Sequence, residues 1–288
     1  MVLLMTNTVL HEQLCILLQN KPGTLYIALS GGIDSITLMT VAARVRKQPV
    51  IALHAVSAAV PELATQRCRE LSAKYDWQLK EIDAREFDNK DYMANPVNRC
   101  YFCKSSLFDR MLQYNASVVL DGFSNATIAT GTNADDLGDY RPGLKAARER
   151  NVWQPYVEAG IDKKAIRRIA TMEGLSELAA LPAQPCLSSR VQTGIAINAN
   201  DLRFIESVEA AITSMTQVGD IRCRITAAGV VVELPVNNPV FQVDQTRKDA
   251  TSIVEELCLV QQKKFIGFQY YKMGSAFLRN TIEIQPDV

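Results

Sequence analysis

The sequence has little histidine and no excess of charge of either sign. Its 288 residues include two histidines, His11 and His54. These are too few for a histidine-rich metal site and have no matching partner, so we interpret both as structural or surface residues. The 31 Lys and Arg residues balance 31 Asp and Glu residues. Without a basic surplus, nucleic acid is not an expected partner.

Long apolar runs are also missing. No window reaches the roughly 18 consecutive apolar residues that a membrane helix needs. The first 20 residues lack the basic segment and the cleavage site of a signal peptide. We therefore expect a cytoplasmic protein without a membrane partner. Its seven cysteines are an odd number, which argues against a disulfide framework and favours thiol or metal chemistry.

The first part of the chain alternates strand and helix patterns. Such alternation is typical of an α/β fold with a parallel sheet and helices on both faces. We expect strands at 24–29, 50–57, 78–83 and 118–121, a strand or a loop at 126–131, and helices at 4–20, 36–47, 61–75, 104–114 and 162–174.

The pattern changes after residues 178–194, which contain two prolines and no clear period. We interpret this stretch as a functional loop or linker. The chain is long for one domain, so we predict a larger α/β domain at 1–185 and a smaller α+β domain at 186–288, which serves substrate binding or oligomerisation. The second domain should contain helices at 200–215 and 242–259 and strands at 220–226, 229–234 and 265–271.

A glycine loop, Ser30–Ser35 (SGGIDS), lies between the first strand and the following helix. Glycines in this place let the backbone approach an anion, and the N–H groups and the helix dipole favour phosphate. Ser30 and Ser35 add hydroxyl donors. Asp34 beside a phosphate suggests an intervening divalent cation, so we assign it a Mg²⁺ role. The alternative is an ordinary turn that requires glycine at Gly31 and Gly32.

This loop resembles the pyrophosphatase loop of the ATP pyrophosphatase (PP-loop) superfamily. The resemblance implies a Rossmann-like domain that cleaves ATP between its α- and β-phosphates, transfers AMP to a carboxylate or carbonyl oxygen, and binds the departing pyrophosphate on the loop. It also implies that the residues after the second strand, Ala55, Val56 and Ser57, line the adenine pocket.

Two cysteines three positions apart, Cys100 and Cys103, stand in the stretch NRCYFCK. Thiolates are the usual ligands of iron–sulfur clusters, and a C-x-x-C pair supplies two of them from one turn. A zinc site, a redox pair and two ordinary buried cysteines are the alternatives. The pair alone does not decide among them.

Three further stretches resemble the LarE family of ATP-dependent sulfur transferases: GTNADDLGDYRPGLKAARE (131–149), PYVEAGIDKKAIRRIA (155–170) and PCLSSR (185–190). The resemblance implies that Cys186 is the sulfur site. It also implies that Cys100, Cys103 and Cys186 hold a 4Fe-4S cluster through three ligands. The implied acceptor is a small carboxylate, such as pyridinium biscarboxylic acid mononucleotide, with a sulfide donor and a homo-oligomeric assembly.

Other positions match the family's motifs. The resemblance implies that Arg222 and Arg224, which alternate on one strand, hold the substrate phosphate, as their guanidinium groups suit a phosphate dianion. Glu233 matches an acidic position, and Arg190 would orient the adenylate. Asp136 lies in an acidic loop with Asp139 and Arg141, where a role in Mg²⁺ or substrate binding competes with a role in holding the loop.

The chain departs from the family pattern by an apparent insertion at 123–131, before TNADD. Rival interpretations are a cluster-dependent tRNA thiolase of the same superfamily, an amidotransferase-type synthetase, and a nucleotide-binding module without chemistry.

Overall fold

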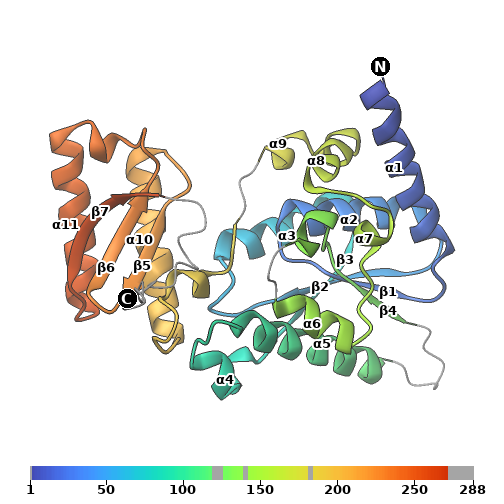
Figure 1. The fold of residues 1–288 in the computed structure, drawn as a ribbon, viewed down its shortest axis with the longest axis horizontal. Helices are drawn as coiled ribbons and strands as arrows, with labels where there is room; N and C mark the ends of the chain where they lie inside the picture. The colour runs from blue at the N-terminus through green and yellow to red at the C-terminus, as the bar shows by residue number, and fades with distance from the viewer. Residues whose placement is uncertain (1, 119–125, 139–141, 181–183, 272–288) are drawn as a thin grey trace, which may run out of the picture. The chain divides into compact units, whose positions relative to one another are not determined.

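The computed structural model describes residues 2–118, 126–138, 142–180 and 184–271 (Figure 1). The chain divides into two compact units. Unit 1 comprises Met1–Tyr92 and Asn98–Gln184, and unit 2 comprises Met93–Val97 and Pro185–Val288.

Unit 1 is built on a four-stranded parallel sheet with the strand order β3-β2-β1-β4. The first three strands run outward from the centre in chain order, and β4 then pairs with the other side of β1. The predicted α/β class with a parallel sheet is therefore confirmed. The strands are β1 (Leu25–Ala28), β2 (Val50–Ala55), β3 (Gln78–Ile82) and β4 (Thr127–Ala129).

Alternate residues of β1 build two cores, one on each face of the sheet. Leu25 and Ile27 pack into the core formed with α1, α2, α3 and α8, whereas Tyr26 and Ala28 pack into the core formed with α5 and α6. A strand buried on both faces reads as a continuous apolar run, as observed here. The helices are α1 (Val2–Asn20), α2 (Ile33–Val45), α3 (Glu62–Tyr75), α5 (Arg99–Val118), α6 (Pro142–Glu149) and α8 (Lys163–Met172) (Figure 1).

Two local predictions changed. Helix α5 begins at Arg99 instead of 104, so the C-x-x-C pair lies within its first turn. The strand expected at 118–121 starts on Val118, which is the last residue of α5, and its other residues lie outside the described ones. Within 126–131, predicted as a strand or a loop, Thr127–Ala129 forms the strand β4. Short helices α4 (Lys90–Met93), α7 (Pro155–Glu158) and α9 (Ser176–Ala179) were not expected.

Unit 2 contains a three-stranded sheet in the order β5-β6-β7, with two helices. Strands β5 and β6 are antiparallel, and β6 and β7 are parallel. Helix α10 contacts β5, and α11 contacts β7. The elements are α10 (Ala199–Thr216), β5 (Arg222–Thr226), β6 (Gly229–Leu234), α11 (Asp244–Val260) and β7 (Phe265–Tyr270), preceded by a short 3-10 helix, η3 (Leu187–Arg190).

A short strap, Met93–Val97, also belongs to unit 2, although its neighbours on both sides belong to unit 1. The buried Asn95 has a positive φ of 53°, which asparagine tolerates better than most residues. Its side-chain amide donates to the carbonyls of Gln192 and Ile195, both at 2.9 Å. Its own carbonyl accepts from the N–H of Gly194 at 2.9 Å. These bonds fix the strap within unit 2.

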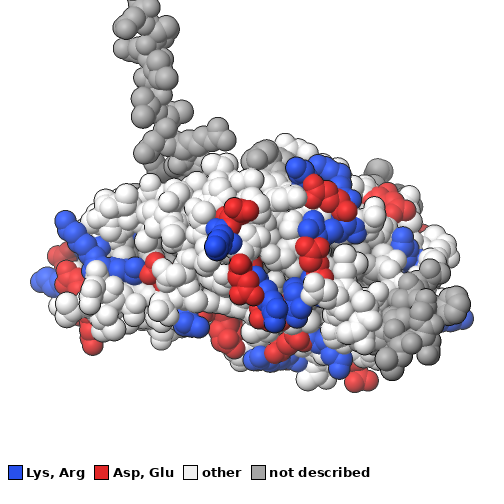
Figure 2. Space-filling view, turned by 90° about the horizontal axis from the view of Figure 1, so that it is seen from below, with Lys and Arg blue, Asp and Glu red and all other residues white. Residues whose placement is uncertain are grey.

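The surface carries both signs of charge. Figure 2 shows Lys and Arg side chains interspersed with Asp and Glu side chains on the face in view. In the part of the chain that the structure describes, no helix combines the length and apolarity needed to cross a membrane.

Candidate active site

The glycine loop connects β1 to α2 in a conformation that only glycine adopts without strain. Gly31 has a φ of 76°, and a Cβ atom there would lie 2.7 Å from the Ala64 carbonyl oxygen of α3. Arg67, also on α3, donates to the Gly31 carbonyl at 2.7 Å. Gly32 is the N-cap of α2 and offers no side chain as a cap. The first N–H groups of a helix have no acceptors within it, so an anion can take that place.

The two serines of the loop are tied to each other. Ser35 Oγ donates to the Gly32 carbonyl at 3.0 Å and accepts from the Ser30 N–H at 3.1 Å. A hydroxyl has one proton to donate, so Ser30 Oγ is the donor in its 3.1 Å contact with Ser35 Oγ. The two serine hydroxyls therefore form hydrogen bonds within the loop itself. Ser30 is exposed, whereas Ser35 is buried.

The segment after β4 lies against this loop. A Cβ atom on Gly131 would be 2.8 Å from the Ser35 nitrogen and 2.9 Å from the Asp34 carbonyl carbon. Strand β1 is flanked by β2 on one side and β4 on the other, so the connections diverge between β1 and β4. In open α/β sheets, ligands bind in the crevice at the carboxyl ends of strands where the order switches in this way. The glycine loop occupies that position.

Asp34 is the acidic group of the loop, and its partner is a lysine from α8. Lys163 Nζ lies 2.5 Å from Asp34 Oδ1, and both side chains are partly exposed. Burial raises the pKa of the Asp34 carboxyl, and the Lys163 ammonium opposes that rise. The Tyr156 hydroxyl donates to the Asp34 carbonyl at 3.0 Å, which fixes the backbone at this point. Neither Lys163 nor Tyr156 was given a role from the sequence.

Asp136 is the other acidic residue predicted near the cation, and its side chain forms a hydrogen bond that holds its own loop. Its carboxylate accepts from the Asn133 N–H at 3.0 Å, and Asn133 in turn caps the short 3-10 helix Ala134–Leu137. Its charge also contributes to the raised pKa of Asp34. Asp139 and Arg141 lie outside the described residues.

The predicted adenine-contacting residues end β2 at the same edge of the sheet. The Val56 N–H donates to the Ile82 carbonyl at 2.9 Å, and the Val56 side chain is exposed. The Ser57 hydroxyl donates to the buried carboxylate of Glu86. Ala55 is half-buried at the end of the strand. These residues offer an apolar contact and a fixed hydroxyl.

His54 supports the loop from below. One ring nitrogen, Nδ1, lies 2.8 Å from the Leu29 carbonyl oxygen and the other, Nε2, lies 2.9 Å from Thr65 Oγ1. Because a carbonyl only accepts, Nδ1 carries the proton and Nε2 accepts from the threonine hydroxyl. The ring is fully buried, and burial lowers its pKa. The neutral imidazole thus joins the end of β1 to α3.

The thiol pair lies at the start of α5. Cys100 and Cys103 are half-buried thiols three residues apart, so they lie on the same side of the helix. A Cβ atom on Gly143 would lie 3.7 Å from the Cys100 carbonyl oxygen, so the start of α6 lies beside the pair. Arg99 is buried next to it.

Cys186 belongs to unit 2, where its backbone is tightly held. Its carbonyl accepts from Ser189 Oγ at 2.8 Å, from the Ser189 N–H at 3.0 Å and from Arg190 Nη1 at 3.3 Å. Arg190 is buried and forms a two-pronged ion pair with Glu209 of α10, at 2.9 and 3.1 Å. Glu209 also accepts from the Cys223 N–H at 3.0 Å. The Cys186 loop is therefore anchored to α10 and β5.

The two arginines of β5 have different surroundings. Arg224 donates to Glu233 at 3.0 Å and to the Ser189 carbonyl at 2.8 Å, which joins it to the Cys186 loop. Arg222 lies 3.5 Å from the Asp220 carboxylate and 5.3 Å from the centre of the Tyr271 ring. Burial and the nearby Arg190 lower the pKa of Arg222.

The structure thus gathers the predicted residues in two sets. Unit 1 brings together the loop, Asp34, Asp136 and the end of β2, while unit 2 brings together Cys186 with its predicted arginines and Glu233. Among the described residues, no group of three or more His, Cys, Asp or Glu side chains could hold a metal ion.

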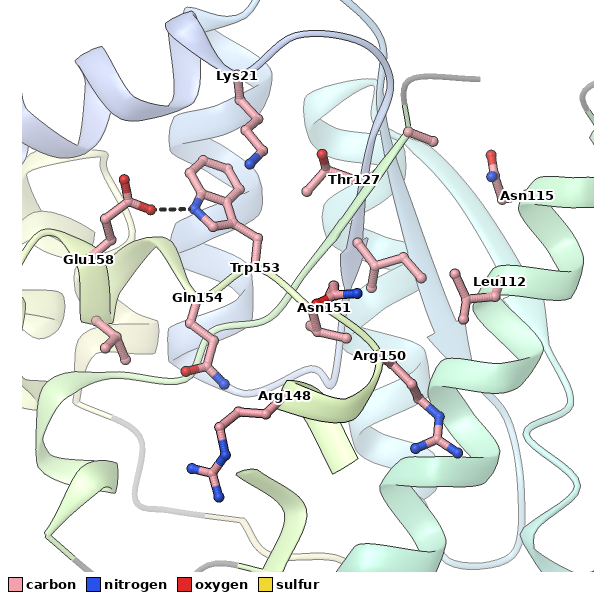
Figure 3. Close-up of a pocket in the computed structure, with 14 residues that line it drawn as sticks. Lys21, Leu112, Asn115, Thr127, Arg148, Arg150, Asn151, Trp153, Gln154 and Glu158 are labelled. Carbon is pink, nitrogen blue, oxygen red and sulfur yellow. Dashed lines mark hydrogen bonds between the residues drawn. The ribbon is translucent and has the colours of Figure 1, made fainter. Parts of the chain in front are cut away.

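A pocket of about 740 Å³ lies at the opposite, amino-terminal end of β4 (Figure 3). The Lys21 ammonium sits 4.7 Å from the centre of the Trp153 ring, and the indole N–H donates to Glu158 at 2.6 Å. Amino ends and carboxyl ends of parallel strands lie at opposite edges, so this pocket is separate from the glycine loop. Glu158 is one of the residues that line this pocket.

The fold and the loop together define a Rossmann-like α/β domain of the PP-loop type. No family model matches the chain. It is 36% identical over 251 residues to the uncharacterized protein slr1717 of Synechocystis sp., covering 85% of each chain. It is 29% identical over 218 residues to the uncharacterized protein MJ0830 of Methanocaldococcus jannaschii, covering 74% of this chain and 79% of that protein.

A third relative carries a function in its name. The chain is 24% identical over 190 residues to the pyridinium-3,5-bisthiocarboxylic acid mononucleotide synthase of Lactiplantibacillus plantarum, covering 66% of this chain and 67% of the synthase. The chain belongs to the same family as the slr1717 protein, and this LarE synthase is a distant homologue. The resemblance to LarE is confirmed at that level, and the three-cysteine cluster stays a prediction.

Replacing Gly131 by alanine should destabilise unit 1. The added methyl would collide with backbone atoms of Asp34 and Ser35, so we expect the free energy of unfolding to fall by about 1–3 kcal/mol in urea titrations. Gly138→Ala is the control, because a Cβ atom there would lie 3.8 Å from its nearest neighbour, the Asp135 carbonyl oxygen. Equal stability of the two variants would contradict the close packing of the loops.

The stability of the protein should depend on His54 below neutral pH. Its folded pKa is lowered, so the stabilisation is complete above the unfolded pKa of about 6.5 and is lost as the pH falls through the window below it. The loss should reach at most about 1.4 kcal/mol per pH unit. In His54→Gln this slope should be shallower between pH 6.5 and 5 in urea titrations, whereas His11→Gln serves as the control. An unchanged slope in His54→Gln would refute the assignment.

Proposed function

We propose that the protein activates a carboxylate of a small, nucleotide-like acceptor with ATP and replaces one of its oxygens by sulfur. The observation that carries this proposal is the glycine loop at the switch point of the sheet, with Asp34 inside it. The loop offers N–H groups and a helix N-terminus to an anion, which suits the pyrophosphate portion of ATP. The distant homology to the bisthiocarboxylic acid mononucleotide synthase supports the acceptor class.

In the first step, a carboxylate oxygen of the acceptor attacks the α-phosphorus of ATP. The bond from that phosphorus to the bridging oxygen breaks, and pyrophosphate leaves along the loop. The acyl adenylate that remains is a good electrophile, whereas the free carboxylate is a poor one. Val56 and Ser57 at the end of β2 would contact the adenine. Asp34 would hold Mg²⁺, which suits a single carboxylate because Mg²⁺ commonly binds through one or two carboxylates plus substrate phosphates.

In the second step, hydrosulfide from an external donor attacks the activated carbon, the bond to AMP breaks, and a thiocarboxylate, AMP and a proton result. We propose Cys186 as the sulfur site, where this sulfide would be held, so the carbon–sulfur bond of Cys186 itself stays intact. The anchoring of its carbonyl by Ser189 and Arg190 supports this role, because it sets the position of the loop thiol. Arg190 then acts as a positioning residue for the thiol, and the sequence-based role of orienting the adenylate stays a prediction.

Cys100, Cys103 and Cys186 would be the ligands of a 4Fe-4S cluster. The side chains available in unit 1 suit such a cluster. Two soft thiol ligands, Cys100 and Cys103, lie on one side of α5, and thiolates are the usual ligands of iron–sulfur clusters. A cluster held by these three thiolates would keep one iron without a protein ligand, and there it would supply the sulfide that the reaction consumes. The supply of that sulfide requires an external donor.

Unit 2 would bind the acceptor. Arg222 stacks near Tyr271 and is the arginine we propose for the acceptor phosphate. Arg224 joins Glu233 to the Cys186 loop, so we assign it a positioning role. The balanced charge of the sequence, and the mixed charges on the face in Figure 2, favour a small acceptor over nucleic acid. Assembly into homo-oligomers remains part of the proposal.

ATP should be converted to AMP and pyrophosphate when the full chain, prepared anaerobically, meets pyridinium biscarboxylic acid mononucleotide. Asp34→Asn should lower kcat/KM for ATP by about 100-fold, because the cation loses its carboxylate. Asp91→Asn, at an exposed position, is the matched control. Formation of ADP instead, or no ATP consumption with this and related carboxylates, would refute the proposed reaction.

Iron and acid-labile sulfide should be present in anaerobically purified protein at about four of each per chain. Cys186→Ala should lose most of this iron, because two thiolates do not hold such a cluster. Cys15→Ala, a half-buried thiol elsewhere in unit 1, should retain it. Wild-type protein without iron, or full iron in Cys186→Ala, would show that these thiols do not form the ligand set.

A further inference from the structure

The ion pair between Lys163 and Asp34 places a positive charge where the loop would receive an anion. Lys163 is the first residue of α8, and two contacts fix its backbone. Asp162 caps the helix by accepting from the Ala165 N–H at 2.6 Å, and the Lys163 N–H donates to Asp135 at 3.0 Å. The remainder of α8 is anchored in the core through Ile166 and Ile169, which are fully buried. The helix therefore presents the lysine from a rigid base.

The side chain itself is less constrained than its backbone. About a third of the Lys163 side chain and a quarter of the Asp34 side chain are exposed, at 33% and 25%. Partly exposed ion pairs contribute little to folding stability. The lysine can therefore leave the carboxylate at small cost to the fold. An ammonium on a flexible stem is suited to follow a phosphate oxygen.

The ion pair also changes the net charge of the loop, because a second carboxylate lies near Asp34. Asp34 and Asp136 are both acidic and close enough for one charge to affect the other. Two carboxylates would repel the polyphosphate of a nucleotide, and Lys163 neutralises one of them. A divalent cation on Asp34 would replace the ammonium there, and the released lysine would have three N–H donors to offer.

We propose that Lys163 is a phosphate-binding residue that Mg²⁺ releases from Asp34. This inference rests on the proposed function, because it assumes that the loop receives the pyrophosphate portion of ATP. This role of Lys163 explains why a negatively charged residue, Asp34, lies in a loop that would bind pyrophosphate. It also couples the two ligands, since Mg²⁺ both occupies Asp34 and frees the lysine for the phosphate.

Calorimetric titration of the full chain with inorganic pyrophosphate tests this inference. With Mg²⁺ present, Lys163→Gln should bind pyrophosphate about tenfold more weakly than wild type, because a charge-assisted hydrogen bond is lost. Lys163→Arg should recover part of the affinity. Lys164→Gln, at the next and exposed position of α8, is the matched control and should bind as wild type does.

A second pair of variants separates this role from a structural one. Without Mg²⁺, Asp34→Asn should bind pyrophosphate more tightly than wild type, by about threefold or more, because it frees Lys163. The double variant Asp34→Asn/Lys163→Gln should lose that gain. A structural lysine would lower the melting temperature and leave both affinities unchanged.

The outcomes are distinct. Equal affinities of Lys163→Gln and wild type, or no gain in Asp34→Asn, overturn the role of Lys163 while the proposed function stands. If the wild-type chain binds neither pyrophosphate nor ATP with Mg²⁺, the proposed function and this inference both fail.

Discussion

The contact between Gly131 and the first residues of α2 is the constraint on which the candidate site depends. It brings two connections, separated by about a hundred residues of chain, to within the distance of a single methyl group. Strand β4 must therefore pair with β1 in a fixed register, and the loop after β1 cannot shift outward. Gly31 imposes the matching condition on the other side, against α3. The glycine loop is thus held rigidly between the segment after β4 and helix α3.

Buried polar groups complete this clamp from inside the protein. His54 and Tyr156 each direct a hydrogen bond to a backbone carbonyl at the ends of the loop, those of Leu29 and Asp34. Both side chains are buried, so they hold these carbonyls in an environment where losing a partner is costly. Unit 2 uses the same device around Cys186, with Arg190 and Glu209. In each unit, buried polar side chains hold the backbone next to a candidate site residue, Asp34 in unit 1 and Cys186 in unit 2.

Most features that depend on neighbouring residues, such as the strands, the helices and the glycine loop, could be predicted from the sequence. The run before the glycine loop is apolar on both faces and was recognisable as a central strand, and the loop itself carries its chemistry in adjacent residues. The strand Thr127–Ala129 has only three residues, too few for a clear pattern, whereas the run from Val118 looked more like a strand. The start of α5 at Arg99 was missed, although Asn98, a residue type favoured at helix N-caps, stands directly before it.

Contacts between distant residues were beyond the sequence. Lys163 lies in a motif that was recognised, but nothing in a single sequence indicates that its ammonium reaches Asp34, 129 positions away. The same holds for Glu209, whose helix position gave no sign of its bond to Arg190. The pair Cys100 and Cys103 was recognisable from its spacing, whereas its grouping with Cys186 came from the resemblance to a family and stays a prediction.

The strap Met93–Val97 limits how this chain can be made and divided. Because unit 2 takes five residues from the middle of unit 1, no single cut releases it whole. A fragment starting at Pro185 would leave three backbone carbonyls without the Asn95 amide that they share. During synthesis, the strap emerges from the ribosome long before the residues that receive it. Its bonds to residues 191–195 can form only after those residues have been synthesised, about a hundred positions later.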